Sequence, residues 1–173
     1  GPRFYKKMKK AKKYFALSGI YMNRRSESFQ TIFEDEEIEK YEIVNEDCRL
    51  AKTFFIFCYF SYLKKAMNKL KKINPDIIHC GNLDMLFFAV IYKRISKRKV
   101  KIVYEIGDLN KRTYNNSIRL DKVVVRKILI YLEKEMCKYV DRLVISTPYF
   151  WDQYYKNFVK RDNVFLFPNM PEK

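Results

Sequence analysis

The chain has 173 residues, of which 48% are apolar and 32% charged, and 36 Lys and Arg against 20 Asp and Glu give a net charge of +16. This length and apolar content suffice for one ordinary domain with a core, and 14 Phe and 14 Tyr argue against intrinsic disorder. Only 4 Gly and 5 Pro exclude collagen-like and low-complexity chains.

The first quarter of the chain predicts a mixture of short elements. Arg3–Lys13 is predicted as a basic helix and Phe15–Met22, aromatic and β-branched, as a strand. Ser26–Glu39 is acidic and weakly patterned, which indicates a surface excursion. Tyr41–Val44 is predicted as a short strand.

A long helix is predicted over Arg49–Ile73. Its first half is apolar nearly all round, and its second half places Leu63, Met67 and Leu70 on one face among lysines. Asn74-Pro75 ends it, because the residue before a proline avoids the helical region.

Strands and helices then alternate four times. The predicted strands are Asp76–Cys80, Val100–Ile106, Asp141–Ser146 and Asn163–Phe167. The predicted helices between them are Leu83–Lys97, Val123–Tyr139 and one that opens at Thr147 as N-cap with Pro148 first and runs to about Phe158. This order predicts one Rossmann-like α/β domain over residues 1–173, with a doubly wound, mostly parallel sheet. The strands lack strict alternation of polar and apolar residues, so we expect both faces of the sheet to be covered.

The helix predicted over Val123–Tyr139 carries a carboxylate beside its apolar side. The apolar stripe comprises Val125, Leu129, Leu132, Met136 and Val140. Glu133 lies about 60° from the centre of this stripe. We expect a partly buried side chain that accepts hydrogen bonds from backbone amides and has no catalytic role.

Ligands of open α/β sheets gather at the carboxyl ends of the strands. This rule nominates four loops, whose candidate residues are His79, Asn82, Asp84, Glu105, Asp108, Lys111, Arg112, Ser146 and Asn169. Carboxylates such as Glu105 and Asp108 accept hydrogen bonds from sugar hydroxyls or act as bases, and Lys111 and Arg112 suit a phosphate. An ordinary polar connection explains the loop after Glu105 almost equally well.

Metal and cofactor chemistry has little support in the sequence. His79 is the one histidine, and the four cysteines are far apart without a CxxC pair, so they are interpreted as small apolar residues in a reducing cytosol. GxGxxG, GxxxxGK[ST], GxSxG and HExxH are all absent.

The longest apolar stretch, residues 53–63, is shorter than the roughly 20 residues that span a bilayer, and no signal-peptide pattern is visible.

The order of these segments resembles the N-terminal half of a retaining, family 4-type glycosyltransferase of the GT-B fold. The segments that carry the resemblance are PRFYKK (2–7), NPDIIH (74–79), VYEIGD (103–108), LE (132–133) followed by YVDRLVIS (139–146), and NVFLFPN (163–169). Gly107 replaces the family's usual histidine, which weakens any transfer of catalytic roles. The family also begins with a strand before its first motif, so we expect this chain to lack that strand.

The resemblance implies the acceptor-binding half of a sugar transferase, as in bacterial surface polysaccharide synthesis. The nine candidate residues would then bind a glycan or lipid-linked acceptor, with no metal and no cofactor in this part. A nucleotide-sugar donor would bind a C-terminal domain or separate subunit, and the chain alone is expected to be inactive in transfer. The implied location is cytoplasmic, on the inner face of an anionic membrane that the helix 54–72 would contact.

Other functions fit the charge. Residues 1–25 hold 9 basic and no acidic residues, residues 26–47 hold 9 acidic residues and one Lys, and the rest holds 26 basic and 11 acidic residues. Such a surface attracts nucleic acid, anionic lipid or diphosphates, or is merely solvated. A basic nucleic-acid-binding α/β domain is the main alternative, although no nucleic acid is expected, since the aromatics fall on core faces. A stand-alone accessory subunit and a flavodoxin-like or receiver-type regulatory domain are further alternatives.

Overall fold

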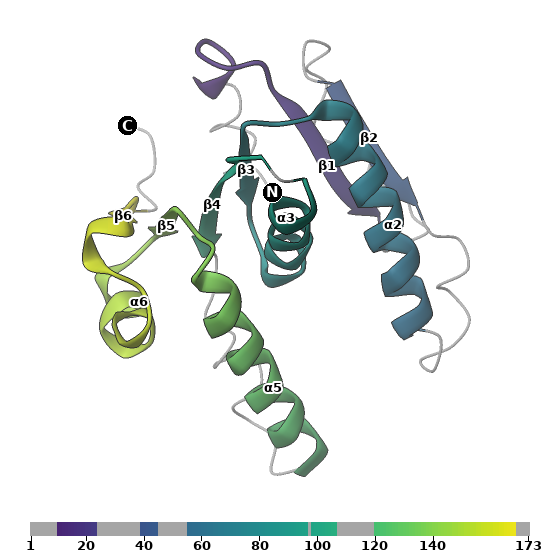
Figure 1. Ribbon diagram of the computed structural model, residues 1–173. Coiled ribbons are helices and arrows are strands. Elements are labelled where there is room, and N and C mark those ends of the chain that lie inside the picture. Colours follow the sequence, from purple (N-terminus) through teal and green to yellow (C-terminus); the bar gives the residue numbers. More distant parts are fainter. Residues whose placement is uncertain (1–9, 24–38, 45–54, 97, 107–119, 169–173) are drawn as a thin grey trace. The chain divides into compact units, whose positions relative to one another are not determined.

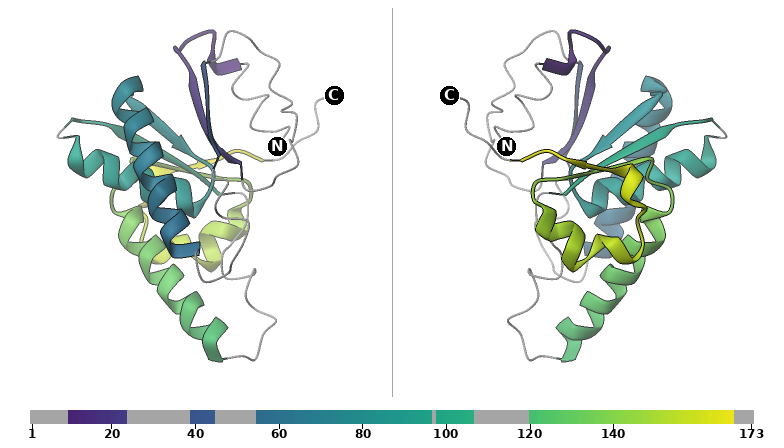
Figure 2. Two further views of the ribbon diagram at one scale, coloured as in Figure 1. Left: turned by 90° about the vertical axis from the view of Figure 1, so that its right-hand side faces the viewer. Right: turned by 90° about the vertical axis from the view of Figure 1, so that its left-hand side faces the viewer.

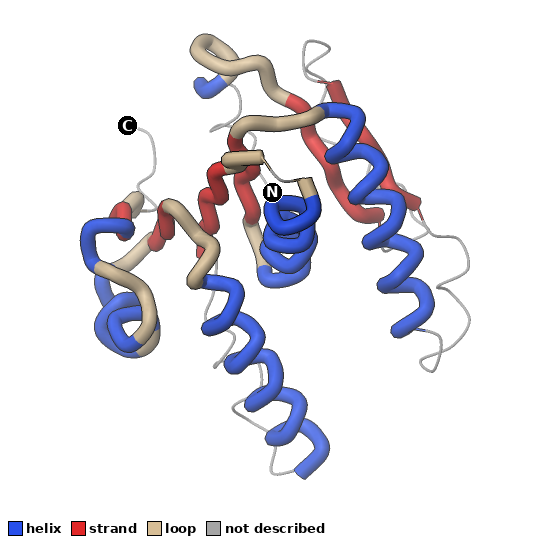
Figure 3. Tube along the Cα trace, in the orientation of Figure 1, coloured by secondary structure: helices blue, strands red, loops and turns tan. Residues whose placement is uncertain are grey.

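The computed structural model describes residues 10–23, 39–44, 55–96, 98–106 and 120–168, and Figures 1 and 3 show how they are folded. The chain divides into two compact units, Gly1–Asn74 and Pro75–Lys173. The boundary falls at the Asn74-Pro75 pair that the sequence marks as a helix end. Asn74 has a φ of 52°, a left-handed conformation that asparagine tolerates at helix ends, and its amide donates to the Leu70 carbonyl at 2.8 Å. The single expected domain stays a prediction.

The first unit contains two parallel strands and one long helix. β1 (Ser18–Asn23) pairs in register with β2 (Glu39–Val44), and α2 (Phe55–Ile73) contacts both strands. Both strands and the second half of the long helix were expected. β1 begins at Ser18, three residues after the predicted start at Phe15. The expected helix at Arg3–Lys13 and the excursion at Ser26–Glu39 lie almost wholly outside the described residues.

One side of α2 is buried and the other is basic. The buried residues Tyr62, Ala66 and Leu70 follow helical spacing, while Leu63 and Met67 of the expected stripe are half-buried. The exposed residues of the described second half include Phe60 and the lysines Lys64, Lys65, Lys71 and Lys72. No helix in the part of the chain that the structure describes is both long enough and apolar enough to cross a membrane.

The second unit is a four-stranded α/β structure. Its elements in chain order are β3 (Ile77–Cys80), α3 (Leu83–Ile95), β4 (Lys101–Ile106), α5 (Leu120–Cys137), β5 (Arg142–Ile145), α6 (Pro148–Gln153), the 3₁₀ helices η3 (Tyr155–Asn157) and η4 (Arg161–Asn163), and β6 (Val164–Leu166). The strands pair in the order β3-β4-β5-β6, all parallel. The expected alternation of strands and helices is therefore confirmed, and so is a parallel α/β sheet consistent with a Rossmann-like fold.

The two faces of this sheet differ in burial. Ile102, Tyr104 and Ile106 of β4 and their paired neighbours Leu143 and Ile145 of β5 are fully buried and form the core face. The alternate residues, which include Val103, Glu105 and Val144, form the second face, where all but Glu105 are half-buried or exposed. Among the described residues one face of β4 and β5 is more buried than the other, and the expected covering of both faces stays a prediction for the second face.

One layer of helices accounts for the core face. α3 contacts β3 and β4, α6 contacts β5, and α3 and α5 contact each other. Because the strand order equals the chain order, right-handed crossovers place these helices on the same face (Figures 1 and 2). Helices on the second face, which a doubly wound sheet requires, stay a prediction.

A buried carboxylate joins the helices to the sheet behind the core face. Glu133 of α5 is 1% exposed, and its Oε1 accepts hydrogen bonds from the hydroxyls of Tyr104 (2.9 Å) and Tyr155 (2.8 Å). Its Oε2 accepts one from the hydroxyl of Tyr154 at 3.0 Å. Burial, and next the nearby Glu133 carboxylate, raise the pKa of all three phenols, so they stay protonated donors.

Glu133 is more buried than the sequence indicated, and it accepts hydrogen bonds from tyrosine hydroxyls of separate elements where backbone amides were expected. β4 provides Tyr104, and the segment after α6 provides Tyr154 and Tyr155. α6 ends at Gln153, earlier than expected, and the chain continues as η3. The predicted stripe of α5 is also partly wrong, since Leu132 is exposed while Glu133 and Cys137 are buried.

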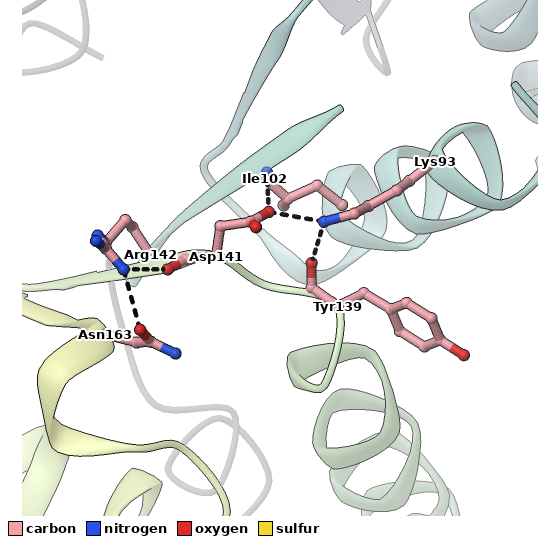
Figure 4. Close-up of polar contacts among 6 residues, drawn as sticks. All are labelled: Lys93, Ile102, Tyr139, Asp141, Arg142 and Asn163. Carbon is pink, nitrogen blue, oxygen red and sulfur yellow. Dashed lines mark hydrogen bonds and ion pairs between the residues drawn. The ribbon is translucent and has the colours of Figure 1, made fainter. Parts of the chain in front are cut away.

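A second polar cluster ties the amino ends of β4 and β5 together (Figure 4). One Asp141 oxygen, Oδ2, accepts hydrogen bonds from the Ile102 amide at 2.8 Å and from Lys93 Nζ at 2.7 Å, and Lys93 also donates to the Tyr139 carbonyl. Arg142 Nη1 donates to Asn163 Oδ1 at 3.0 Å, which links β5 to the start of β6. This cluster lies at the amino ends of the strands, whereas the candidate ligand site is at their carboxyl ends. We therefore assign the cluster a structural role.

Replacing Glu133 by alanine is expected to lower the free energy of unfolding by about 3–5 kcal/mol, because three buried hydroxyls lose their acceptor. Urea unfolding followed by circular dichroism measures this loss. The matched control is Glu135→Ala on the same helix, where the partially exposed carboxylate pairs with Lys138 at 2.7 Å and is expected to cost less than about 1 kcal/mol. Equal losses for the two variants would contradict the assigned role of Glu133.

Asp141 is expected to stabilise the fold less as the pH falls. Burial raises the pKa of its carboxyl group, but the hydrogen bonds from Lys93 and the Ile102 amide outweigh burial, and the net pKa is lowered. A lowered folded-state pKa contributes stability above the unfolded value of about 3.9 that is lost as the pH falls through the folded value. Asp141→Asn should therefore cost about 1–2 kcal/mol at pH 7, and this difference should shrink below about pH 4 in urea titrations. A difference that is independent of pH would refute the charge contribution.

Candidate site at the carboxyl ends of the strands

The carboxyl ends of β3, β4 and β5 lie at one edge of the second unit. Cys80 pairs with Tyr104, and Ile106 pairs with Ile145, so the three strands end near the same level. His79, Glu105 and Ser146 lie in or directly after the last residues of these strands. The structure thus brings residues from three of the four nominated loops to one edge, as the sequence predicted.

His79 and Glu105 form the central contact of this edge. His79 Nε2 lies 3.1 Å from Glu105 Oε2, and the two side chains are 34% and 9% exposed. Glu105 is therefore the inner residue, and His79 is its more accessible neighbour. The contact is defined by distance, and it places a carboxylate beside an imidazole, a group that donates hydrogen bonds to hydroxyls or phosphates.

The parallel register explains why these two residues meet. His79 pairs with Val103, and Glu105 is two residues farther along β4 on the same face, so the pair is a diagonal neighbour on the second face. The sequence nominated the two residues separately and missed their contact. The alternation of side chains between the two faces of each strand would have predicted this contact, once the register of β3 against β4 was known.

Asn82 and Asp84 lie at the start of α3, next to this edge. Asn82 is the N-cap of α3, and its Oδ1 accepts the Met85 amide at 2.9 Å. Asp84 is half-buried in the first turn, where a carboxylate interacts favourably with the helix dipole. Both residues therefore have structural roles in addition to any part in binding.

Ser146 is half-buried between β5 and α6. The next residue, Thr147, is the N-cap that the sequence predicted, and its Oγ1 accepts the Tyr149 amide at 3.3 Å. The remaining nominated residues lie outside the described part of the chain, and these are Asp108, Lys111, Arg112 and Asn169. Their part in a binding site stays a prediction.

The cysteines whose side chains the structure describes belong to the core. Cys80 and Cys137 are free and buried, and burial raises the pKa of the Cys80 thiol to about 12 and also that of Cys137. Such thiols stay protonated and unreactive, which confirms their interpretation as small apolar residues. Within the described ranges no three His, Cys, Asp or Glu side chains gather closely enough to hold a metal ion.

Comparisons with known proteins leave the family open. No protein-family model matches the chain, and no curated protein matches it significantly. The functional argument therefore depends on the residues at the carboxyl edge.

Removing the cap of α3 tests the structural role of Asn82. Asn82→Ala is expected to lower the free energy of unfolding by about 1 kcal/mol, because the Met85 amide loses its acceptor. Asn82→Asp keeps an acceptor oxygen and should stay within a few tenths of a kcal/mol of the wild type. Thermal and urea unfolding measure both variants, and an alanine variant as stable as wild type would show that the cap contributes nothing.

Proposed function

We propose that the chain is the acceptor-binding half of a GT-B glycosyltransferase of the retaining family 4 type. The observation that carries this proposal is the contact between His79 and Glu105 at the carboxyl edge of a parallel sheet. Both residues belong to the segments that resemble the family, NPDIIH and VYEIGD. Their meeting at the ligand edge of the sheet is what an acceptor site in such a domain requires.

The chemistry of the edge suits a sugar or sugar diphosphate. Glu105 lies 3.1 Å from the imidazole of His79, and the more exposed imidazole is the group that contacts an acceptor hydroxyl or phosphate. Ser146 adds a hydroxyl at the end of the neighbouring strand. Asn82 Oδ1 caps α3, and the two N–H groups of its side-chain amide are the donors that it adds to the proposed site.

Transfer requires a second part. A nucleotide-sugar donor must be held in line with the acceptor, and one lobe cannot position both reactants. In this proposal a C-terminal domain or separate subunit binds the donor, and the isolated chain transfers no sugar at a measurable rate. The acceptor is a glycan or a lipid-linked sugar, and the enzyme works in the cytoplasm at the inner membrane face, where lysines of α2 are attracted to anionic headgroups.

The proposed fold needs one more strand. Among the described strands β3 is an edge, and Ile77 on it is 47% exposed. Parallel sheets normally bury their strands on both sides, and an apolar edge strand readily takes a further strand. In the proposed fold a further parallel strand pairs with this edge of β3.

A nucleic-acid-binding domain is the second candidate. The net charge of +16 and the row of lysines on α2 support it. The aromatic residues that stacking would require are largely in the core, as in the case of Tyr104, Tyr154 and Tyr155. Stacking on bases therefore has little support among these residues, and the sugar acceptor is favoured.

A titration followed by nuclear magnetic resonance tests the proposed site. The isotopically labelled chain is mixed with a short-chain polyprenyl diphosphate sugar, and separately with an oligoribonucleotide. Shift changes with the sugar lipid are expected around His79, Asn82 and Ser146, and Glu105→Gln should weaken binding roughly fivefold or more, as loss of one charged hydrogen-bonding group implies.

The control for this titration is Glu135→Gln. This carboxylate lies near the C-terminal end of α5, which leads to the amino end of β5, opposite the carboxyl edge. It should bind as wild type does. Shift changes confined to exposed lysines, or produced only by the oligoribonucleotide, would refute the acceptor site and favour the second candidate.

A further inference from the structure

Helix α5 (Leu120–Cys137) has one buried side and one exposed apolar side. Glu133, Met136 and Cys137 are buried in the second unit. On the opposite side Val124, Ile128 and Tyr131 are 56%, 52% and 63% exposed, and the neighbouring Val123 and Leu132 are also exposed. The positions 124, 128, 131 and 132 follow helical spacing, so these side chains form one continuous stripe, here called the α5 stripe.

The position of α5 explains the exposure. Figures 1 and 2 show the first half of the helix projecting beyond the end of the four-stranded sheet, while its second half lies beside the other elements of the unit. Among the α5 residues whose burial is described, those that belong to the core all lie in this second half. Isolated exposed aliphatic residues are ordinary, but a continuous row on a projecting helix marks a surface that binds something.

Lysines border the α5 stripe on one side. Lys127 and Lys134 are exposed, and by helical geometry they lie on the same side of the stripe, within about 90° of its centre. Lys138 extends this border and is paired with Glu135. Glu133 is buried against its three tyrosines and does not face the stripe. Glu135 is one turn beyond Tyr131 in line with the stripe, and its carboxylate is paired with Lys138. The exposed side of α5 therefore combines aliphatic residues, one tyrosine and a basic border, and ends at this ion pair.

This combination favours an anionic lipid surface over a second copy of the chain. Pairing two copies along the stripe would bring two basic borders and two chains of charge +16 together. Against an anionic leaflet each lysine instead strengthens binding by about fivefold. Nucleic acid suits the lysines but gives Val124 and Ile128 no apolar environment, whereas a headgroup region accepts aliphatic side chains and the amphipathic ring of Tyr131.

We propose that the α5 stripe inserts into the headgroup region of an anionic membrane, with Lys127 and Lys134 at the lipid phosphates. Among the α2 residues whose burial is described, 60–73, the exposed ones are lysines, Asn68 and one aromatic residue, Phe60, so this part attracts a membrane mainly by charge. This inference does not depend on sugar transfer, because a lipid surface is bound whether or not an acceptor occupies the carboxyl edge.

Vesicle co-sedimentation tests the insertion. The full chain is mixed with vesicles of phosphatidylcholine alone and of phosphatidylcholine with phosphatidylglycerol. Binding to the anionic vesicles is expected, with a steep loss on adding salt, and Ile128→Asp should reduce it by about 10- to 100-fold. The matched control is Ile95→Asp, at an equally exposed isoleucine (58%) at the end of α3, which should change binding by less than about threefold.

Depth of insertion gives a second readout that does not depend on a destabilising charge. Tyr131→Trp and Ile95→Trp each add one indole to a chain whose own Trp151 provides the reference signal. Lipids brominated in their acyl chains should quench the indole at position 131 and leave the one at position 95 unchanged.

Three outcomes overturn the proposal. They are anionic-vesicle binding that Ile128→Asp leaves intact, quenching that is equal at positions 131 and 95, and a dimer in sedimentation equilibrium that Ile128→Asp abolishes without any vesicle binding. The last outcome would identify the α5 stripe as an interface between copies. Circular dichroism of each variant confirms that a loss of binding does not come from unfolding.

Discussion

The register of β4 between β3 and β5 is the constraint on which the rest of the second unit depends. Side chains of a strand alternate between two faces, so the pairing of Tyr104 with Cys80 and Leu143 assigns every β4 residue to a face. A shift of one residue would expose Ile102 and Ile106 and bury Lys101 and Val103. The hydrophobic core and the candidate site are thus two consequences of one set of backbone hydrogen bonds.

Tyr104 and Glu105 show how this constraint links stability to function. The hydroxyl of Tyr104, on the core face, donates to the buried Glu133, which also holds the segment after α6 through Tyr154 and Tyr155. The next residue, Glu105, is on the second face and contacts His79. A buried carboxylate satisfied by phenols fixes the strand from behind, and a nearly buried carboxylate on its other face lies 3.1 Å from an imidazole at the ligand edge.

Much of this arrangement could be predicted from the sequence, and the rest depended on pairing. The Asn74-Pro75 stop, the Thr147 cap and the parallel strands were predictable, since local chemistry and the order of elements determine them. Leu132 was misassigned because an apolar residue on a helix fits a core stripe whether or not that part of the helix reaches the core. The three tyrosine partners of Glu133 come from distant segments, so no local pattern showed them. The candidate residues near Asp108 lie outside the described part of the chain.

The most direct test of this account is the pattern of inter-strand nuclear Overhauser effects around Val103. The register predicts contacts between backbone protons of β4 and both the residues flanking His79 on β3 and those flanking Arg142 on β5, with the pattern of parallel pairing. Strong contacts between opposed α-protons, which indicate antiparallel strands, or a pairing displaced by one residue would contradict it. Either result would separate His79 from Glu105 and remove the basis of the proposed acceptor site.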